Sequence, residues 1–214
     1  MFEEVLSRNA KEALAILGKS GILGDAYLAG GTALALRLGH RVSADLDFFS
    51  IKEFEEQTLV KQLSSLPIDF ELEKLAWGTI LGYVKKTKFS IFFYDYDWLG
   101  QPDKFSGIKI AGIEDIAPMK LLAISDRGTK RDFVDLYFIL ALEKLYSLKE
   151  VLGLYDKKFK VLRQNKIHII KSLTYFREAD EMPMPRMLKE VSWPKVKNFF
   201  ELETKHLIKE LSAI

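Results

Sequence analysis

The chain has 214 residues, and its 32 basic and 30 acidic side chains leave a formal net charge of only +2. This balance excludes a strong overall attraction to nucleic acid or to a membrane, so any basic surface must be local. The absence of cysteine excludes disulfides, thiolate metal sites and thiol nucleophiles. With 48% hydrophobic residues, a chain of this length can bury a substantial core, in one domain or in two small lobes.

The first segment has helical spacing. Apolar residues recur at steps of three and four between residues 2 and 17, before a glycine-rich stretch at residues 18–24. Charged residues are interspersed among them, which argues against a signal peptide and against a membrane span. We therefore expect a cytoplasmic protein without membrane contact.

A short apolar run at residues 26–29 predicts a strand that ends in a glycine pair, Gly30 and Gly31. Thr32 is the expected cap of a helix over residues 33–38. A glycine pair at a helix start lets the backbone approach a triphosphate, whose negative charge is favoured by the free N–H groups and the helix dipole.

Polar and apolar residues then alternate strictly from Ser43 to Asp47. The alternation predicts a strand that places Ser43, Asp45 and Asp47 on one face. The two carboxylates would lie about 7 Å apart at the backbone, near enough to share one or two Mg²⁺ or Mn²⁺ ions, and they repel each other without cations. Ser43 can hold a phosphate oxygen or satisfy a backbone group, and Arg41 can pair with Asp47 or with the substrate.

The patterns between residues 53 and 94 predict a helix followed by three strands: 53–63, 68–75, 79–84 and 88–94. From Glu114 onward the period is helical, with Asp115 as the expected cap of a helix over 116–125 and Thr129 as the cap of a helix over 131–142. Strands thus fill the first half and helices the second.

The order of these motifs resembles that of the polymerase-β-like nucleotidyltransferases, in which a glycine pair opens a helix and an Asp-x-Asp strand follows. More closely, the sequence is similar to the AbiEii/AbiGii toxin family of that superfamily in Gly30-Gly31-Thr32-Ala33-Leu34, Arg41, Ser43 and Asp45-Leu46-Asp47-Phe48-Phe49. The resemblance implies an α/β (α+β) fold: a core with a mixed sheet over residues 1–113, and a helical lobe over 114–214 that completes the active-site cleft. It implies catalytic and metal-binding roles for Asp45 and Asp47, and nucleotide binding by Gly30, Gly31, Thr32, Arg41 and Ser43.

A second block matches the same family at Lys120, Arg131, Asp132 and Asp135. The resemblance implies that Lys120 is catalytic and binds the nucleotide phosphates, that Arg131 binds the nucleotide, and that both acids are catalytic. Either acid can fix the lysine, position the base or accept a proton from the incoming hydroxyl. Alternatively, Arg131 and Asp135 form only a surface ion pair, worth roughly 0.3–0.5 kcal/mol.

Many enzymes of the superfamily supply a third carboxylate from a neighbouring strand, but the strand predicted at 88–94 has no acid in its middle. Asp95 follows it, either as a third metal ligand or as part of a polar turn with Asp97. A catalytically inactive nucleotide-binding module is therefore an alternative.

The resemblance implies an enzyme that transfers a nucleoside monophosphate from an NTP to a hydroxyl, with Mg²⁺ or Mn²⁺ and release of pyrophosphate. It also implies an RNA acceptor, such as a tRNA end, and an antitoxin partner in a type IV, AbiE-like toxin–antitoxin system. A small-molecule or protein hydroxyl is the alternative acceptor, because one metal site serves any of them. A basic run in the helical half can form a groove for RNA or a solvated face: Lys157, Lys158, Lys160, Arg163, Lys166 and Lys171.

Overall fold

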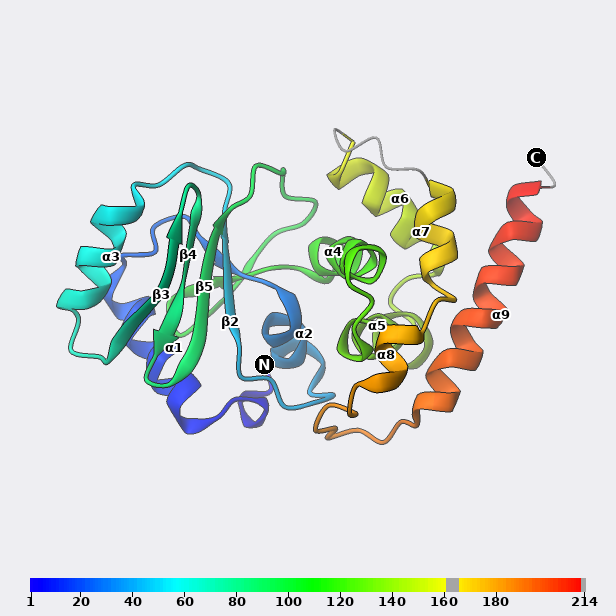
Figure 1. Cartoon of the computed structure of the whole chain (residues 1–214), viewed down its shortest axis with the longest axis horizontal. Helices are drawn as coiled ribbons and strands as arrows, with labels where there is room; N and C mark the ends of the chain where they lie inside the picture. Colours follow the sequence, from blue (N-terminus) through cyan, green and yellow to red (C-terminus); the bar gives the residue numbers. More distant parts are fainter. Residues whose placement is uncertain (161–165, 213–214) are drawn as a thin grey trace. The chain divides into compact units, whose positions relative to one another are not determined.

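A computed structural model describes residues 1–160 and 166–212. The chain divides into two compact units, Met1–Gly112 and Ile113–Ile214, whose α-helices and longer strands are labelled in Figure 1. In the described part of the chain, no helix has both the length and the apolar character that crossing a bilayer requires.

The first unit contains a mixed sheet with helices. Its elements are η1 (Glu3–Val5), α1 (Arg8–Ser20), β1 (Tyr27–Leu28), α2 (Gly30–Leu38), β2 (Leu46–Ser50), α3 (Glu56–Ser65), β3 (Phe70–Ala76), β4 (Thr79–Val84), β5 (Thr87–Phe93), β6 (Asp103–Phe105) and β7 (Ile108–Ile110). The seven strands, all from the described residues, lie in the order β3-β4-β5-β2-β1-β7-β6. Strand β2 is parallel to β5 and antiparallel to β1, and β1 is parallel to β7. This mixed sheet, accompanied by helices, confirms the predicted fold class.

Helix α1 forms as its sequence predicts. The Ser7 hydroxyl accepts a hydrogen bond from the Ala10 N–H at 3.1 Å, which caps the helix start. The helix continues through Gly18 and ends at Ser20, and the following C-cap residue, Gly21, has a left-handed φ of 69°. Its apolar face, which includes the fully buried Leu14 and Leu17, packs toward β5 and β7. Each such leucine contributes about 1.5–3 kcal/mol of hydrophobic stabilisation.

Strand β2 lies in the middle of the sheet. Its buried residues alternate with half-exposed ones, and Phe48 packs on Phe89 of β5 with ring centroids 5.5 Å apart. The strand begins at Leu46, so the prediction that it starts at Ser43 is wrong, and Asp45 lies in the loop just before it. Strands β6 and β7 were not predicted, since three residues each are too short to show an alternation.

The second unit is helical in its described residues, 113–160 and 166–212. Its elements are α4 (Ile113–Asp126), α5 (Lys130–Tyr137), the π-helical turn η2 (Phe138–Leu142), α6 (Leu148–Lys158), α7 (Lys166–Ser172), α8 (Arg177–Glu181) and α9 (Trp193–Ser212). Helix α4 packs against α5, α6 and α7, and α9 packs against α5 and α6. An aromatic cluster around Phe133 joins α5 to α8 and α9 through Phe176, Trp193 and Phe200.

Two predictions in this unit are wrong for one reason. Asp115 is not a cap: it lies inside α4, fully buried, and accepts a hydrogen bond from Lys158 Nζ at 2.7 Å. The same ion pair removes Lys158 from the proposed basic groove, because the lysine side chain is also buried. Of the other members of that run, Arg163 lies outside the described residues, and Lys166 pairs with Asp156 at 2.6 Å.

Candidate active site

The candidate site of the first unit begins where β1 leads into α2. Gly30, the first residue of the helix, has a φ of 66°, a conformation that L side chains rarely adopt. A Cβ at this position would lie 3.4 Å from Asp47 Oδ2. Glycine therefore serves both the turn and the close approach of the backbone to the carboxylate. The Ala29 N–H also donates to the Asp47 carbonyl at 3.0 Å, which fixes this turn to β2.

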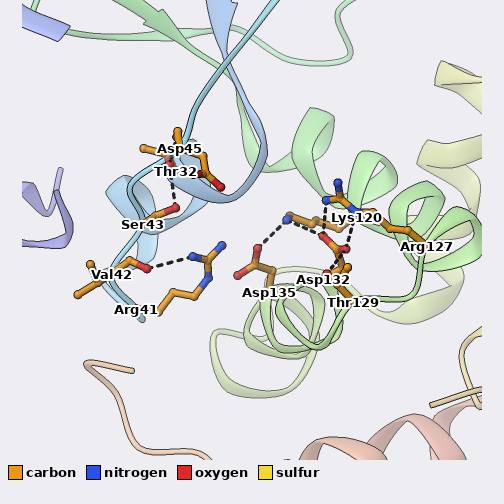
Figure 2. A network of polar contacts seen from close by, with 10 residues as sticks. All are labelled: Thr32, Arg41, Val42, Ser43, Asp45, Lys120, Arg127, Thr129, Asp132 and Asp135. Carbon is orange, nitrogen blue, oxygen red and sulfur yellow. Dashed lines mark hydrogen bonds and ion pairs between the residues drawn. The ribbon is translucent and has the colours of Figure 1, made fainter. Parts of the chain in front are cut away.

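Thr32 holds the loop that carries Asp45. It lies inside α2 and does not cap it, because its hydroxyl donates to the Asp45 carbonyl oxygen. Since the single hydroxyl proton of Thr32 is used there, Ser43 donates to Thr32 in the 2.8 Å bond between their hydroxyls. Figure 2 shows these three residues together. Ser43 therefore contacts a side-chain hydroxyl and not the backbone group of the second alternative, and its contact with a phosphate oxygen stays a prediction.

Asp47 is paired across the sheet with Ser90. The two residues are register partners on the parallel strands β2 and β5, and the Ser90 hydroxyl donates to Asp47 Oδ1. The neighbouring strand, which was predicted to have no acid in its middle, thus places a serine opposite Asp47. Ser90 is 2% exposed, and its hydrogen bond fixes the rotation of the Asp47 carboxylate while leaving Oδ2 toward Gly30.

Asp95 lies elsewhere. Strand β5 continues three residues beyond Ser90, about 10 Å at 3.3 Å per residue, and Asp95 follows its end. At that end, the Tyr94 N–H donates to the Ser50 carbonyl at 2.7 Å, at the last residue of β2. Asp95 is therefore not the third carboxylate of this site. Its position after the end of β5 agrees with the alternative interpretation, in which it belongs to a polar turn with Asp97.

The predicted pairing of Arg41 with Asp47 is not formed. Arg41 is buried, and its Nη1 donates to the Val42 carbonyl at 3.1 Å. Among the described residues, no cationic side chain pairs with Asp47. A half-buried carboxylate without a cation, two residues from a second one, is an arrangement that a metal ion stabilises.

Within residues 1–160 and 166–212, no group of three or more histidine, cysteine, aspartate or glutamate side chains is placed to bind a metal. Two carboxylates nevertheless suit Mg²⁺, which keeps several water ligands and is commonly bound by one or two carboxylates together with substrate phosphates. Asp45 and Asp47 therefore fit a metal that arrives with a nucleotide, and they do not fit a preformed cage of protein ligands.

The candidate site of the second unit centres on Lys120, a buried residue of α4. Its Nζ lies 3.0 Å from Asp132 Oδ1 and 2.7 Å from Asp135 Oδ2, and both acids project from α5 (Figure 2). Asp135 is fully buried, so the alternative of a surface ion pair between Arg131 and Asp135 is wrong. Two of the three N–H groups of Lys120 are used by these acids, and the third is left for another acceptor.

Arg127 and Thr129 complete this cluster from the loop between α4 and α5. The Arg127 guanidinium binds Asp132 in a bidentate manner, with Nε 3.0 Å from Oδ2 and Nη2 3.1 Å from Oδ1. The Thr129 hydroxyl donates to Oδ2 at 2.5 Å, so Thr129 stands at the N-cap without capping the helix through its side chain.

These contacts set the charge of Asp132. Burial by itself raises the pKa of Asp132, but the Lys120 charge, the hydrogen bonds and charge of Arg127, and the Thr129 hydrogen bond outweigh it and lower the pKa to about 2. So acidic a group is a poor proton acceptor at neutral pH. Of the three roles considered for Asp132, fixing the lysine is the one that the geometry supports.

Sequence reasoning missed three polar side chains of the site: Ser90, Arg127 and Thr129. Ser90 stands alone in an apolar strand, which is a weak signal that a polar partner faces it. Thr129 was predicted only as a cap, and no role was predicted for Arg127. Arg131, in contrast, was predicted to bind the nucleotide. It is exposed on α5, and it is not among the residues that contact the Asp132 carboxylate.

Comparisons with known proteins show the family of this sequence. The profile of the family described as "Nucleotidyl transferase AbiEii toxin, Type IV TA system" matches residues 12–76 and 83–205. An uncharacterized protein of Aquifex aeolicus (strain VF5) is 38% identical over 213 residues, which cover 95% of this chain and 98% of that protein.

Two solved structures have similar folds. JHP933 from Helicobacter pylori matches with a TM-score of 0.53 and 22% identity over 97% of each chain. MenT4, a nucleotidyltransferase toxin from Mycobacterium tuberculosis H37Rv, matches with a TM-score of 0.55 and 14% identity over 92% of this chain and 84% of that one. The family match covers most of the sequence, including both candidate sites. This chain therefore belongs to the AbiEii family of nucleotidyltransferase toxins of type IV toxin–antitoxin systems.

Proposed function

We propose that this nucleotidyltransferase moves a nucleoside monophosphate from an NTP to a hydroxyl of RNA, and that Asp45 and Asp47 bind the Mg²⁺ or Mn²⁺ that the reaction requires. The observation that carries the metal assignment is the Asp47 carboxylate: it is oriented by Ser90, lies against the Gly30 backbone and has no cationic partner among the described residues.

In the proposed reaction, the acceptor oxygen forms a bond to the α-phosphorus of the NTP, and the bond from that phosphorus to the β-phosphate oxygen breaks. Pyrophosphate leaves, and the hydroxyl proton passes to solvent or to a carboxylate of the Asp45 and Asp47 pair. Divalent ions bound at these residues would make the attacking hydroxyl easier to deprotonate and would neutralise the negative charge of the leaving pyrophosphate. Thr32 and Ser43 keep Asp45 in place, and Ser90 does the same for Asp47.

Lys120 is proposed to bind the triphosphate. Asp132 and Asp135 hold its ammonium between them, so the third N–H points in a fixed direction. The two acids are positioning residues in this proposal. A lysine held in this way loses little side-chain freedom when it contacts a phosphate, which favours binding.

RNA as acceptor and an antitoxin protein as partner are further parts of the proposal. They are supported by membership of a toxin–antitoxin family.

The test is pyrophosphate release by the purified full chain, incubated with Mg²⁺, each of the four NTPs and total tRNA. Asp45→Ala/Asp47→Ala should abolish release. The chain offers a matched control, Asp95→Ala/Asp97→Ala, which removes two acids at the same spacing from beyond the end of β5. We expect the control to retain the activity of the parent protein.

Release that requires RNA and one preferred NTP, and that is lost only in the first double variant, would support the proposal. Release without RNA but with a small hydroxyl compound would overturn the RNA acceptor alone. Loss of release in the control as well would overturn the assignment of the metal site to Asp45 and Asp47. NTP binding without release under all conditions would overturn the transfer reaction.

A further inference from the structure

A pocket of about 580 Å³ lies within the second unit, between the C-terminal end of α4 with its following loop and the helix α7 with the turn after it. Its walls include Ile124, Arg127, Lys171 and Tyr175. This volume is in the range of small-molecule sites, which use apolar walls and a few polar groups to orient a ligand. None of the predicted catalytic, nucleotide-binding or metal-binding residues lines it, but Lys171 belongs to the basic run that was predicted to form an RNA groove or a solvated face.

Lys171 gives the pocket an available positive charge. Lys171 is exposed and, among the described residues, pairs with no acid. Other lysines of this unit are engaged: Lys189 lies 2.6 Å from Glu143, and Lys197 lies 2.9 Å from Asp180. His168, which also lines the pocket, is three residues earlier on α7 and therefore shares a face with Lys171. The pair is suited to an anionic group such as a phosphodiester.

Tyr175 provides an aromatic surface beside this charge. Its side chain is 53% exposed although it is a large ring, and it lines the same pocket. Bases of single-stranded nucleic acid stack on such rings. Asp126 and Glu178 also line the pocket, and their oxygens can accept hydrogen bonds from a ribose 2′-hydroxyl or an exocyclic amine. A cation, an aromatic face and hydrogen-bond acceptors together match a nucleotide within RNA.

The pocket shares a wall with the lysine cluster. Arg127 lines the pocket and at the same time binds Asp132, which holds Lys120. A nucleotide in the pocket would therefore lie beside the residues that we assign to the triphosphate. We propose that this pocket binds one nucleotide of a single-stranded segment of the RNA acceptor, stacked on Tyr175 with its phosphate at Lys171. The inference rests on the proposed function, because it names where that acceptor is held.

The test measures binding of the full chain to a short fluorescein-labelled single-stranded RNA by anisotropy, at several salt concentrations. Tyr175→Ala should weaken binding roughly 5- to 150-fold, the range for loss of one stacked base, whereas Tyr175→Phe keeps the ring and should bind like the parent protein. Lys171→Ala should reduce the slope of log affinity against log salt concentration by about 1, the amount expected for the loss of one phosphate contact. Lys195→Ala, which removes an exposed lysine from α9, is the matched control and should change nothing.

Mg²⁺-NTP binding to the same variants, followed by calorimetry, separates this inference from the proposed function. If Tyr175→Ala and Lys171→Ala lose RNA affinity while NTP binding is unchanged, the pocket is the RNA site. If both variants bind RNA like the parent protein, or if the parent does not bind the RNA, the pocket assignment is overturned even when NTP binding and pyrophosphate release persist. If the parent binds no NTP, the proposed function fails on its own. Equal weakening by Lys195→Ala would indicate diffuse electrostatic binding and would also overturn the pocket.

Discussion

Replacing Asp132 by asparagine tests whether the charge of this carboxylate stabilises the second unit. Burial favours the neutral acid, but the Lys120 and Arg127 charges and the hydrogen bonds to Asp132 lower its pKa from 3.8 to about 2. Because the pKa is lower in the folded state, the stabilisation is complete above the unfolded value and is lost as the pH falls through the folded value. The fall from 3.8 to about 2 corresponds to about 2 kcal/mol of unfolding free energy.

The assay is urea unfolding at a series of pH values between about 5 and about 2, where this contribution disappears. The chain has three tryptophans, so a Trp77→Phe/Trp98→Phe background leaves Trp193 as the fluorescent reporter. Its ring packs on Phe133, the neighbour of Asp132 in sequence, with centroids 5.8 Å apart. The unfolding free energy of the parent should fall by about 2 kcal/mol more over this pH range than that of the Asp132→Asn variant.

An exposed ion pair of the same unit provides the control. Asp156 lies 2.6 Å from Lys166, and both side chains are about half exposed. Asp156→Asn should change the unfolding free energy by less than about 1 kcal/mol and should leave its pH dependence close to that of the parent. If Asp132→Asn shows the same acid dependence as the parent, then Lys120 and Arg127 do not stabilise the Asp132 charge, and the argument for a fixed lysine fails with it.

Three further changes test other parts of the structure. Ser90→Ala should raise the Mg²⁺ concentration for half-maximal pyrophosphate release by roughly tenfold, since supporting hydrogen bonds to metal ligands have effects of this size, and Ser90→Thr should restore the parent value. Gly30→Ala should destabilise the chain by about 1–2 kcal/mol in thermal unfolding and reduce activity, because φ is 66° there and the added methyl meets Asp47. An unchanged melting temperature would contradict this. Lys158→Met should lower the unfolding free energy, measured with urea, by about 3–5 kcal/mol because it leaves a buried charge on Asp115. Lys158→Met with Asp115→Leu should recover most of that loss. Equal losses in both variants would show that packing, and not charge, is decisive.

The parts of the candidate site that the sequence predicted are those that local chain geometry determines. A glycine pair before a helix and two acids two residues apart are visible in a single stretch, and the structure places Gly30 against Asp47 as that stretch suggests. The predicted start of β2 was wrong because the extent of a strand depends on the segments with which it forms hydrogen bonds. Pairing with β5 begins at Leu46, and Thr32 satisfies the Asp45 carbonyl before the strand starts.

Contacts between distant segments account for what the sequence did not predict. Ser90 is 43 residues from Asp47 in sequence, and only the register of two parallel strands shows that they meet. Lys158 belongs to a run of basic residues that ordinarily faces solvent, but Asp115, also 43 residues away, compensates its charge and allows it to be buried. Neither the residue pattern nor the composition can indicate a partner that lies so far away in the sequence.

Asp47 and the pair formed by Asp132 and Asp135 have the same residue type but opposite electrostatic surroundings. Asp132 and Asp135 are neutralised within the second unit by Lys120, and Asp132 also by Arg127, so a metal ion would compete with charges that are already in place. Among the described residues, Asp47 has a serine as its polar partner and no cation. A divalent ion therefore gains more at Asp47 than at Asp132 or Asp135. This difference supports our proposal that the metal binds at Asp45 and Asp47, and that Asp132 and Asp135 act through the lysine that they hold.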